Sequence, residues 1–230
     1  MKPPSPILLI HGALGSAASF KPLIPLLEAQ SFKVHTFDLG GHGANSYSGP
    51  LSMRLFGEEV LAYLDKHGLH SVSIFGFSMG GYAALQLASI APQRIDSILT
   101  LGTKWDWDLA QIERETTPLN PDFLLEKAPK YAAKLEETHT GQGWRPLLAR
   151  TSELLNRLAK EGGFSTELAT KIQTPVRILL GDSDKMVTRD VSEAMAAALP
   201  KGSFRMLPNT PHPLEKVDSS LLVQEMLEVF

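Results

Sequence analysis

Short apolar runs alternate along the chain with longer segments that repeat apolar residues at helical spacing. The runs are continuous rather than alternating, which is typical of parallel strands covered on both faces. We expect strands over Pro6–Ile10, Phe32–Leu39, Val72–Phe75, Ile95–Leu101, Val176–Leu180 and Ser203–Leu207. We expect helices over Ala17–Ala29, Leu51–His67, Met79–Ala91, Thr188–Leu199 and Ser219–Phe230. This order predicts an α/β fold with a mainly parallel sheet of about six strands flanked by helices, and with ligands bound beyond the carboxyl ends of the strands.

One interval breaks this alternation. From Lys104 to Gln173 no convincing strand is found, and the pattern indicates helices over Trp107–Glu115, Pro121–Glu137, Trp144–Glu161 and Thr166–Ile172. We expect residues 1–103 and 174–230 to form the core. Residues 104–173 are expected to form a helical cap over the strand ends, inserted after the strand Ile95–Leu101.

A serine stands between one expected strand and the helix that follows it. Glycines two residues before and two residues after Ser78 form the pattern of a nucleophile elbow, a sharp turn that exposes a serine hydroxyl. Side chains at Gly76 and Gly80 would collide in so tight a turn. The helix start behind Ser78 adds free N–H groups and a positive dipole end. Because the short pattern also occurs by chance, the rest of the chain must supply a base and an acid.

Composition narrows the classes of partner and chemistry. The 230 residues are 43% hydrophobic and 20% charged, with a formal net charge of −3 and no cysteine. We therefore expect neither nucleic acid nor an anionic membrane as a partner, and no disulfide, thiolate metal site or cysteine nucleophile. Only four consecutive apolar residues precede His11, too few for a signal peptide. No run reaches the ~18 residues of a membrane span, and we expect a cytoplasmic protein.

An activated serine needs a base and a carboxylate that orients the base. Of the seven histidines, His212 is the one that lies beyond all candidate acids, in the loop after the last expected strand and between two prolines that restrict its backbone. Asp182 and Asp184 both follow the strand Val176–Leu180. Asp184 is far enough from the strand to turn toward a neighbouring loop, whereas Asp182 is placed to cap its own turn. Asp184 is the favoured acid, and Asp182 is the alternative.

The chain order Ser78, Asp184, His212 is that of α/β-hydrolases. The chain resembles the α/β-hydrolase superfamily, and within it the small capped single-domain serine esterases. The resemblance rests on five segments, Ile10–Ser16, Phe37–Gly43, Gly76–Gly80, Gly181–Asp184 and Thr210–Pro213. Gly40 and Asn45 replace the proline and serine common in the family's second loop, and the early first strand leaves no room for the usual N-terminal hairpin.

The resemblance implies an α/β-hydrolase fold with a helical cap and an oxyanion hole made of two backbone N–H groups. Ala13 would supply one N–H and Met79 the other, and such a donor is worth roughly 10²–10³ in rate. We expect no cofactor and no catalytic metal ion. We interpret His11 and His42 as structural side chains that pack or bond within their own turns.

The three tryptophans, Trp105, Trp107 and Trp144, all fall in the expected cap. They either bury the cap helices against the core or, together with Leu14, line an apolar acyl pocket. Because the charges of this interval nearly balance, the expected substrate is a small molecule with a neutral to apolar acyl group.

The leading hypothesis is therefore a serine hydrolase of carboxylic esters, thioesters included, acting through an acyl-enzyme on Ser78. The same triad also serves cofactor-free hydrolases and lyases of C–C bonds, and the same scaffold serves ligand-binding receptors. A serine nucleophile disfavours the dehalogenase and epoxide hydrolase branches, whose nucleophile is aspartate. C–C bond chemistry and ligand binding both remain open as alternatives at this point.

Overall fold

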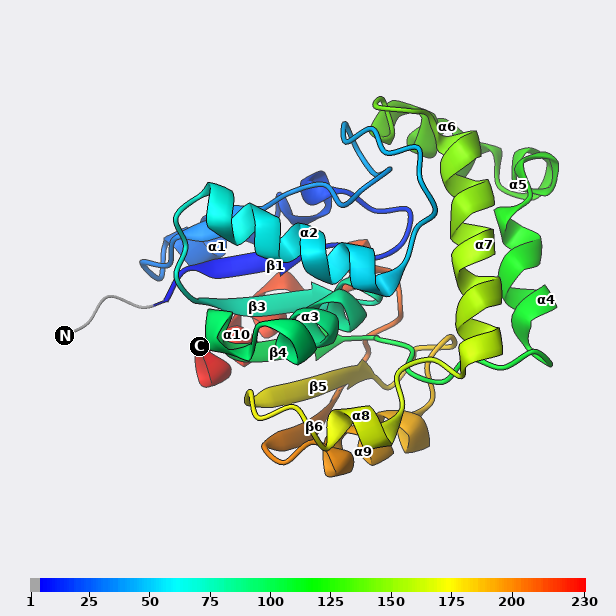
Figure 1. Ribbon diagram of the computed structural model, residues 1–230. Coiled ribbons are helices and arrows are strands. Elements are labelled where there is room, and N and C mark those ends of the chain that lie inside the picture. The colour runs from blue at the N-terminus through cyan, green and yellow to red at the C-terminus, as the bar shows by residue number, and fades with distance from the viewer. Residues whose placement is uncertain (1–4) are drawn as a thin grey trace.

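The computed structural model, which describes residues 5–230, contains a six-stranded sheet in the order β2-β1-β3-β4-β5-β6. The strands are β1 (Ile7–Ile10), β2 (Val34–Thr36), β3 (Val72–Phe77), β4 (Ile95–Leu101), β5 (Val176–Gly181) and β6 (Gly202–Leu207). Every neighbouring pair is parallel, so the carboxyl ends of all strands meet at one edge of the sheet (Figure 1). The prediction of a parallel α/β sheet is confirmed.

Helices cover both faces of this sheet. They are α1 (Ile24–Glu28), α2 (Met53–Lys66), α3 (Met79–Ile90), α8 (Thr166–Ala169), α9 (Arg189–Ala198) and α10 (Ser219–Val229). In Figure 1, α2, α3, α8 and α9 lie on one face, and α1 and α10 lie on the other. The single helix expected over Ala17–Ala29 is divided into a 3-10 turn, η1 (Ala17–Phe20), and α1. Pro25 is the second residue of α1, because proline fits the first turn of a helix but not its interior.

The apolar core is divided between the two faces of the sheet. Leu8 and Ile10 of β1 join a cluster with α2 and α3, whereas Ile7 and Leu9 join a second cluster with α1 and α10. All of these side chains are fully buried. Since both faces are covered, inner strands such as β1 and β5 are largely continuous apolar runs, whereas the edge strand β6 alternates between exposed and more buried residues.

Between β4 and β5 the chain consists of helices and loops that, apart from α8, lie at the edge where the strands end (Figure 1). We call α4 (Ile112–Thr116), α5 (Pro121–Lys127), α6 (Pro129–Thr138) and α7 (Trp144–Glu161) the cap helices. A 3-10 turn, η3 (Thr117–Leu119), connects α4 to α5. The helix expected over Pro121–Glu137 breaks at Ala128, because Pro129 has no N–H to continue it. The first cap helix begins at Ile112 rather than Trp107, and α8 ends at Ala169 rather than Ile172.

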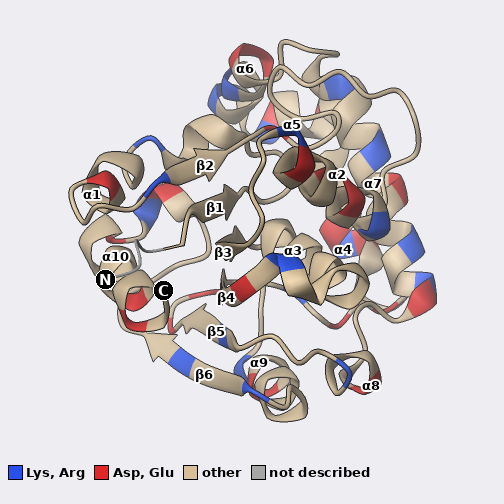
Figure 2. Cartoon of the chain, turned by 60° about the vertical axis from the view of Figure 1, so that its left-hand side comes forward, with Lys and Arg blue, Asp and Glu red and all other residues tan. Residues whose placement is uncertain are grey.

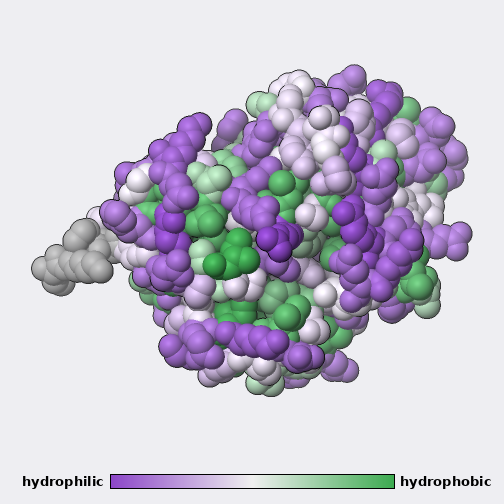
Figure 3. Space-filling model, in the orientation of Figure 1, coloured by the Kyte–Doolittle hydropathy of each residue, from purple (hydrophilic) through white to green (hydrophobic). Residues whose placement is uncertain are grey.

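The surface carries both signs of charge. Figure 2 shows basic and acidic residues interspersed over the helices, and Figure 3 shows hydrophobic groups separated by hydrophilic side chains on the face in view. In Figure 2, neither sign of charge occupies the whole of the side in view. Among residues 5–230, no helix combines the length and the apolar character that crossing a membrane requires.

Candidate active site

Ser78 lies on the sharp turn between β3 and α3. Its backbone has φ 50° and ψ −117°, a conformation that costs a residue with a side chain about 1–3 kcal/mol. The Ser78 N–H donates to the carbonyl of Leu101 at 2.8 Å, and the Ser78 carbonyl accepts from the Gly81 N–H at 3.0 Å and from Thr103 Oγ1 at 2.9 Å. Buried Thr103 was not found by sequence reasoning, because no short motif contains it. These bonds hold the strained turn in place.

The two glycines of the elbow are required by close backbone contacts. A Cβ atom at Gly76 would lie 2.5 Å from the Cα of Gly81, and one at Gly80 would overlap the carbonyl oxygen of Ile10. Side chains are therefore excluded at both positions, for the reason the sequence pattern indicated. The turn exposes Ser78 at the strand ends, where it is half-buried.

Asp184 and His212 come together from the loops after β5 and β6. Asp184 Oδ2 lies 2.7 Å from Nδ1 of His212, with the carboxylate side chain 2% exposed and the imidazole 14% exposed. The other oxygen, Oδ1, accepts from the N–H groups of Met186 at 2.8 Å and Val187 at 3.1 Å. Because a carboxylate can only accept, the neutral ring of His212 has its proton on Nδ1 and none on Nε2.

Asp182, the alternative acid, is used differently. Its carboxylate accepts from the backbone N–H groups of Asn209 at 3.0 Å and Thr210 at 3.2 Å, and from Ser183 Oγ at 2.9 Å. The hydrogen bond from the Asn209 N–H is the main reason that the Asp182 pKa is lowered, and the Ser183 hydroxyl adds to it. Asp182 therefore anchors the start of the loop that carries His212, and it does not contact the imidazole.

The imidazole of His212 lies beside the elbow. Its ring centroid is 5.4 Å from that of Phe77, the residue before Ser78. A Cβ atom at Gly102, next to Leu101, would lie 3.3 Å from Cε1 of His212. Among residues 5–230 no hydrogen bond joins Ser78 Oγ to the ring. Catalytic hydrogen bonds are often formed only once substrate is bound.

The loop after β1 runs against the elbow. A Cβ atom at Gly12 would lie 3.1 Å from Cβ of Ser78. The next residue, Ala13, is exposed, and within the described part of the chain neither its N–H nor that of Met79 donates to another residue. The Met79 N–H is free because the first turn of a helix leaves its N–H groups without partners. Two free donors thus flank the serine on the two segments that sequence reasoning named.

The tryptophans occupy different environments. Trp105 is 1% exposed and packs with Tyr82 and Phe164, with ring centroids 6.1 and 6.2 Å away. Trp105 thus belongs to the core cluster that α2 and α3 form with the sheet. Trp144 is also buried, in a cluster of cap residues against which Leu14 packs. Leu14 therefore packs against both clusters, that of Trp105 and that of Trp144.

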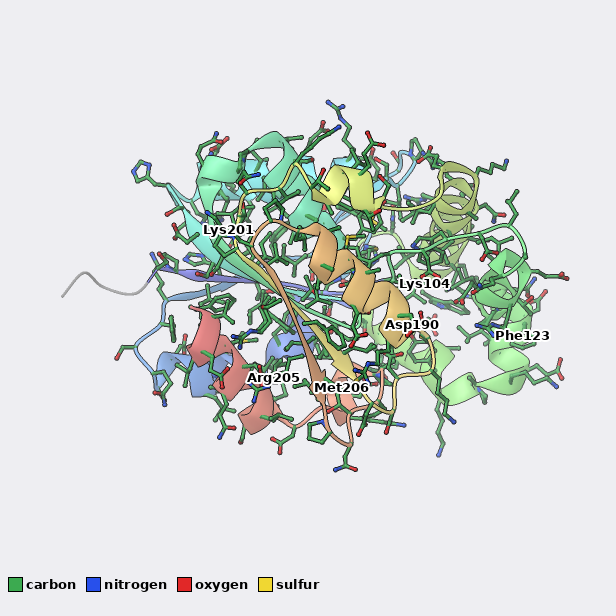
Figure 4. All side chains as sticks on the ribbon, turned by 90° about the horizontal axis from the view of Figure 1, so that it is seen from below. Lys104, Phe123, Asp190, Lys201, Arg205 and Met206 are labelled. Atoms are coloured by element: carbon green, nitrogen blue, oxygen red, sulfur yellow. The ribbon has the colours of Figure 1, made fainter. Side chains whose placement is uncertain are left out.

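Lys104 links the end of β4 to the cap helices. Its ammonium group forms an ion pair with Glu115 of α4 at 2.9 Å, and both side chains are about nine-tenths buried. The half-buried ring of Trp107 lies 4.9 Å from the same ammonium group, and its indole N–H donates to the Lys104 carbonyl. In Figure 4, Lys104 lies between the sheet and the cap helices, whereas Phe123 lies at the outer side on α5. Trp107 thus packs on a buried ion pair.

Three buried histidines lie near these loops. The His11 ring bonds the Gly12 carbonyl through Nδ1 at 2.8 Å and accepts from the Leu39 N–H through Nε2 at 3.1 Å. Burial lowers the pKa of His11 to about 4 and holds that of His42 well below its usual value. The structural interpretation of both residues agrees with these contacts. The third, His139, bonds two body loops from the cap side and was not singled out by sequence reasoning.

Potential metal ligands were compared across the described residues. Within residues 5–230, no group of three or more histidine, aspartate or glutamate side chains is arranged to hold a metal ion. The acceptor atoms at the site are instead bonded to backbone N–H groups and to the imidazole of His212.

Comparison with protein families and curated proteins identifies relatives. The family model described as alpha/beta hydrolase fold matches residues 5–160. Human serine hydrolase-like protein 2 is 34% identical over 165 residues, covering 70% of this chain and 49% of that protein. The pimeloyl–acyl-carrier-protein methyl ester esterase of Edwardsiella ictaluri is 32% identical over 97 residues, covering 42% of this chain and 36% of that protein. The chain spans about half, or less, of the length of these curated relatives.

Solved structures share the fold over nearly the whole chain. A thermophilic esterase from Thermogutta terrifontis superposes with a TM-score of 0.78 at 21% identity, covering 97% of this chain and 88% of that one. The 2-hydroxy-6-oxo-6-phenylhexa-2,4-dienoate hydrolase of Rhodococcus superposes with a TM-score of 0.77 at 21% identity, covering 98% and 90%. At these identities the likeness is one of fold.

Proposed function

Because the chain belongs to the alpha/beta hydrolase fold family, we propose that it is a serine hydrolase that cleaves carboxylic esters, thioesters included, through an acyl-enzyme on Ser78. The observation that carries this proposal is the 2.7 Å bond between Asp184 and His212 beside a serine on a strained elbow. In the neutral ring, that bond keeps the proton of His212 on Nδ1 and leaves Nε2 without one on the side away from Asp184. A base in that state is what a serine hydroxyl needs to become a nucleophile.

The proposed reaction has two halves. His212 Nε2 removes the proton of the Ser78 hydroxyl while Oγ attacks the ester carbonyl, and the resulting oxyanion is bound by the N–H groups of Ala13 and Met79. The intermediate collapses when His212 returns the proton to the leaving alcohol. Water then attacks the acyl-enzyme with the same histidine as base, the bond between Ser78 Oγ and the acyl group breaks, His212 returns the proton to Oγ, and the free acid leaves. Asp184 stabilises the imidazolium that forms in each half.

The proposed substrate is a small molecule with a neutral to apolar acyl group. Leu14 and the buried cluster around Trp144 lie next to Ala13, where an acyl chain bound in the oxyanion hole would extend. Apolar side chains with a few polar groups are the usual lining of such sites. A cytoplasmic location, with neither nucleic acid nor a membrane as partner, belongs to the same proposal.

A fluorophosphonate probe and a series of p-nitrophenyl esters test this function. We expect the probe to label Ser78, and labelling to vanish in S78A and H212A, while both variants keep the melting temperature of the wild type within a few degrees. Labelling at another residue, or full esterase activity in S78A, would contradict the mechanism. Labelling of Ser78 without turnover of any ester would favour C–C bond chemistry or ligand binding on the same triad.

A further inference from the structure

His139 of the cap side bridges two loops of the body. It follows α6 and is 1% exposed. Its Nδ1 accepts from the backbone N–H of Gly43 at 2.9 Å, and its Nε2 lies 3.1 Å from the carbonyl oxygen of Leu14. The Gly43 N–H can only donate, so Nδ1 must be unprotonated. The ring proton is therefore on Nε2, where it donates to Leu14.

Leu14 is held in an uncommon backbone conformation. Its φ is 59°, in the left-handed region that leucine rarely adopts. The Leu14 side chain packs against the buried cluster of Trp144 and Leu148, while its carbonyl is bonded by His139. Contacts from the cap side thus reach both the side chain and the carbonyl of Leu14, which directly follows Ala13.

The hydrogen bond of His139 continues as a chain to the oxyanion donor. The Leu14 carbonyl belongs to the same peptide group as the Gly15 N–H, and that N–H donates to the Gly12 carbonyl at 3.1 Å. The Gly12 carbonyl in turn belongs to the same peptide group as the Ala13 N–H. Hydrogen bonds joined in series through planar peptide groups orient and polarise one another.

We propose that His139 is a positioning residue that orients and polarises the Ala13 N–H through the peptide groups Leu14–Gly15 and Gly12–Ala13. This inference rests on the proposed function, because Ala13 is assigned there as an oxyanion donor. His11 supports the same unit from the body side, since its Nδ1 donates to the Gly12 carbonyl. The oxyanion loop is thus held between an imidazole of the body and an imidazole of the cap.

The surroundings of His139 keep its ring neutral. Burial lowers the pKa of His139, partly offset by its hydrogen bond to Leu14 and by the charge of Asp38. The His42 ring, 5.9 Å away, is itself buried, and burial holds the pKa of His42 well below its usual value. In the neutral ring one nitrogen accepts and the other donates, which is the arrangement that the Gly43 N–H and the Leu14 carbonyl require.

Two amide substitutions separate the contacts of His139. In H139Q the carboxamide nitrogen reaches the position of Nε2 and keeps the donor to Leu14. In H139N the carboxamide oxygen takes the position of Nδ1 and keeps only the acceptor for Gly43. We expect H139N to lower kcat on a p-nitrophenyl ester about tenfold or more with KM little changed, because a whole oxyanion donor is worth about 10²–10³. H139Q should keep most of kcat.

A trifluoromethyl ketone serves as a second probe, since its adduct on Ser78 places an oxyanion against the same donors. H139N should weaken its inhibition by the factor that kcat falls, and H139Q should not. Equal losses of kcat in both variants with equal drops in melting temperature would show a packing role and overturn this inference alone. So would an H139N variant with wild-type kcat. A wild-type protein that neither turns over esters nor is labelled at Ser78 would overturn the proposed function, and this inference with it.

The wild-type protein offers a test that does not depend on a variant folding. Nitrogen NMR of the imidazoles should show His139 as the Nε2–H form, and formation of the phosphonate adduct on Ser78 should shift its Nε2–H signal through the hydrogen-bond chain. An Nδ1–H form, or an Nε2–H signal that the adduct leaves unchanged, would overturn the inference.

Discussion

A Cβ atom on Gly102 would lie 3.2 Å from Nδ1 of His212 and equally close to the Asp184 carboxylate. Gly102 also has φ +62°, a conformation that favours glycine. Its N–H donates to the Leu179 carbonyl, and it follows Leu101, whose carbonyl holds the Ser78 N–H. This glycine therefore sets the space in which Asp184 and His212 meet beside Ser78.

We expect Gly102→Ala to lower kcat by at least tenfold, because the new methyl group displaces the imidazole by some tenths of an ångström, and small misplacements of catalytic groups cost up to about 10² in rate. Gly68→Ala is the matched control. Gly68 has the same φ of +62°, but nothing lies within 4 Å of an added Cβ. Both variants should have a lower melting temperature, because alanine is strained at a φ of +62°. Gly68→Ala should nevertheless keep its kcat. Equal kcat in the two variants would contradict the proposed role of Gly102.

Replacing each aspartate of the loop after β5 tests which one serves His212. Asp184→Asn should lower kcat by about 10⁴, because an amide cannot stabilise the imidazolium and favours the wrong tautomer. Asp182→Asn should keep most of kcat and lower the melting temperature, because it weakens the anchoring of Asn209 and Thr210. Esterase rates and thermal melts of both variants measure this. The reverse pattern would assign the triad to Asp182.

The sheet, the elbow and the order of the candidate triad could be read from the sequence because each depends on neighbours in the chain. Parallel strands give continuous apolar runs, and the elbow needs glycines at fixed distances from Ser78. The choice between Asp182 and Asp184 was open in the sequence, since both follow the same strand. The structure distinguishes them by partner, backbone N–H groups for Asp182 and the His212 ring for Asp184.

Other features depend on contacts across long stretches of chain and could not be predicted. His139 lies 125 residues from Leu14, and no local pattern marks it as a partner of that carbonyl. Trp105 shares its residue type and interval with Trp144, yet Trp105 joins the large cluster with α2 and α3, whereas Trp144 joins a small cluster of cap residues. The break at Ala128 follows from a proline that a longer apolar pattern concealed.

The two buried tryptophans should therefore respond differently to truncation. Trp105→Ala should lower the free energy of unfolding by about 3–5 kcal/mol with little change in acyl preference, because it empties the core beside Tyr82. Trp144→Ala should also destabilise, but it opens space against Leu14 and should shift kcat/KM toward longer acyl chains. Lost or gained methylene contacts are worth about 1–3 kcal/mol of discrimination. Measuring kcat/KM along the p-nitrophenyl series decides this. Unchanged selectivity in Trp144→Ala would place the acyl pocket elsewhere.

Because of its buried histidines, we expect the folded protein to lose stability in acid. Burial is the main cause that lowers the pKa of His11 to about 4 and that lowers the pKa values of His42 and His139. In the unfolded chain these groups return to about 6.5 and bind more protons than in the folded chain. The free energy of unfolding should thus be constant above about pH 6.5 and fall from there toward about pH 4, by up to ~1.4 kcal/mol per pH unit for each histidine. Glu59, whose pKa is raised by burial, opposes part of this fall.

Urea unfolding between about pH 7.5 and about pH 4.5 measures the slope of the free energy of unfolding against pH. Two substitutions show which residues cause it. H139Q removes one buried titrating ring while keeping the bond to Leu14. The slope of the free energy of unfolding against pH should therefore decrease by up to ~1.4 kcal/mol per pH unit, which corresponds to one proton. H70Q is the control, because His70 is exposed and should leave the slope unchanged. In the purified protein, the fluorescence of the buried Trp105 and Trp144 reports global unfolding. A wild-type slope near zero down to about pH 4.5 would show that the three imidazoles are protonated in the folded protein without cost. In that case the fixed donor and acceptor roles given to His11 and His139 would be wrong.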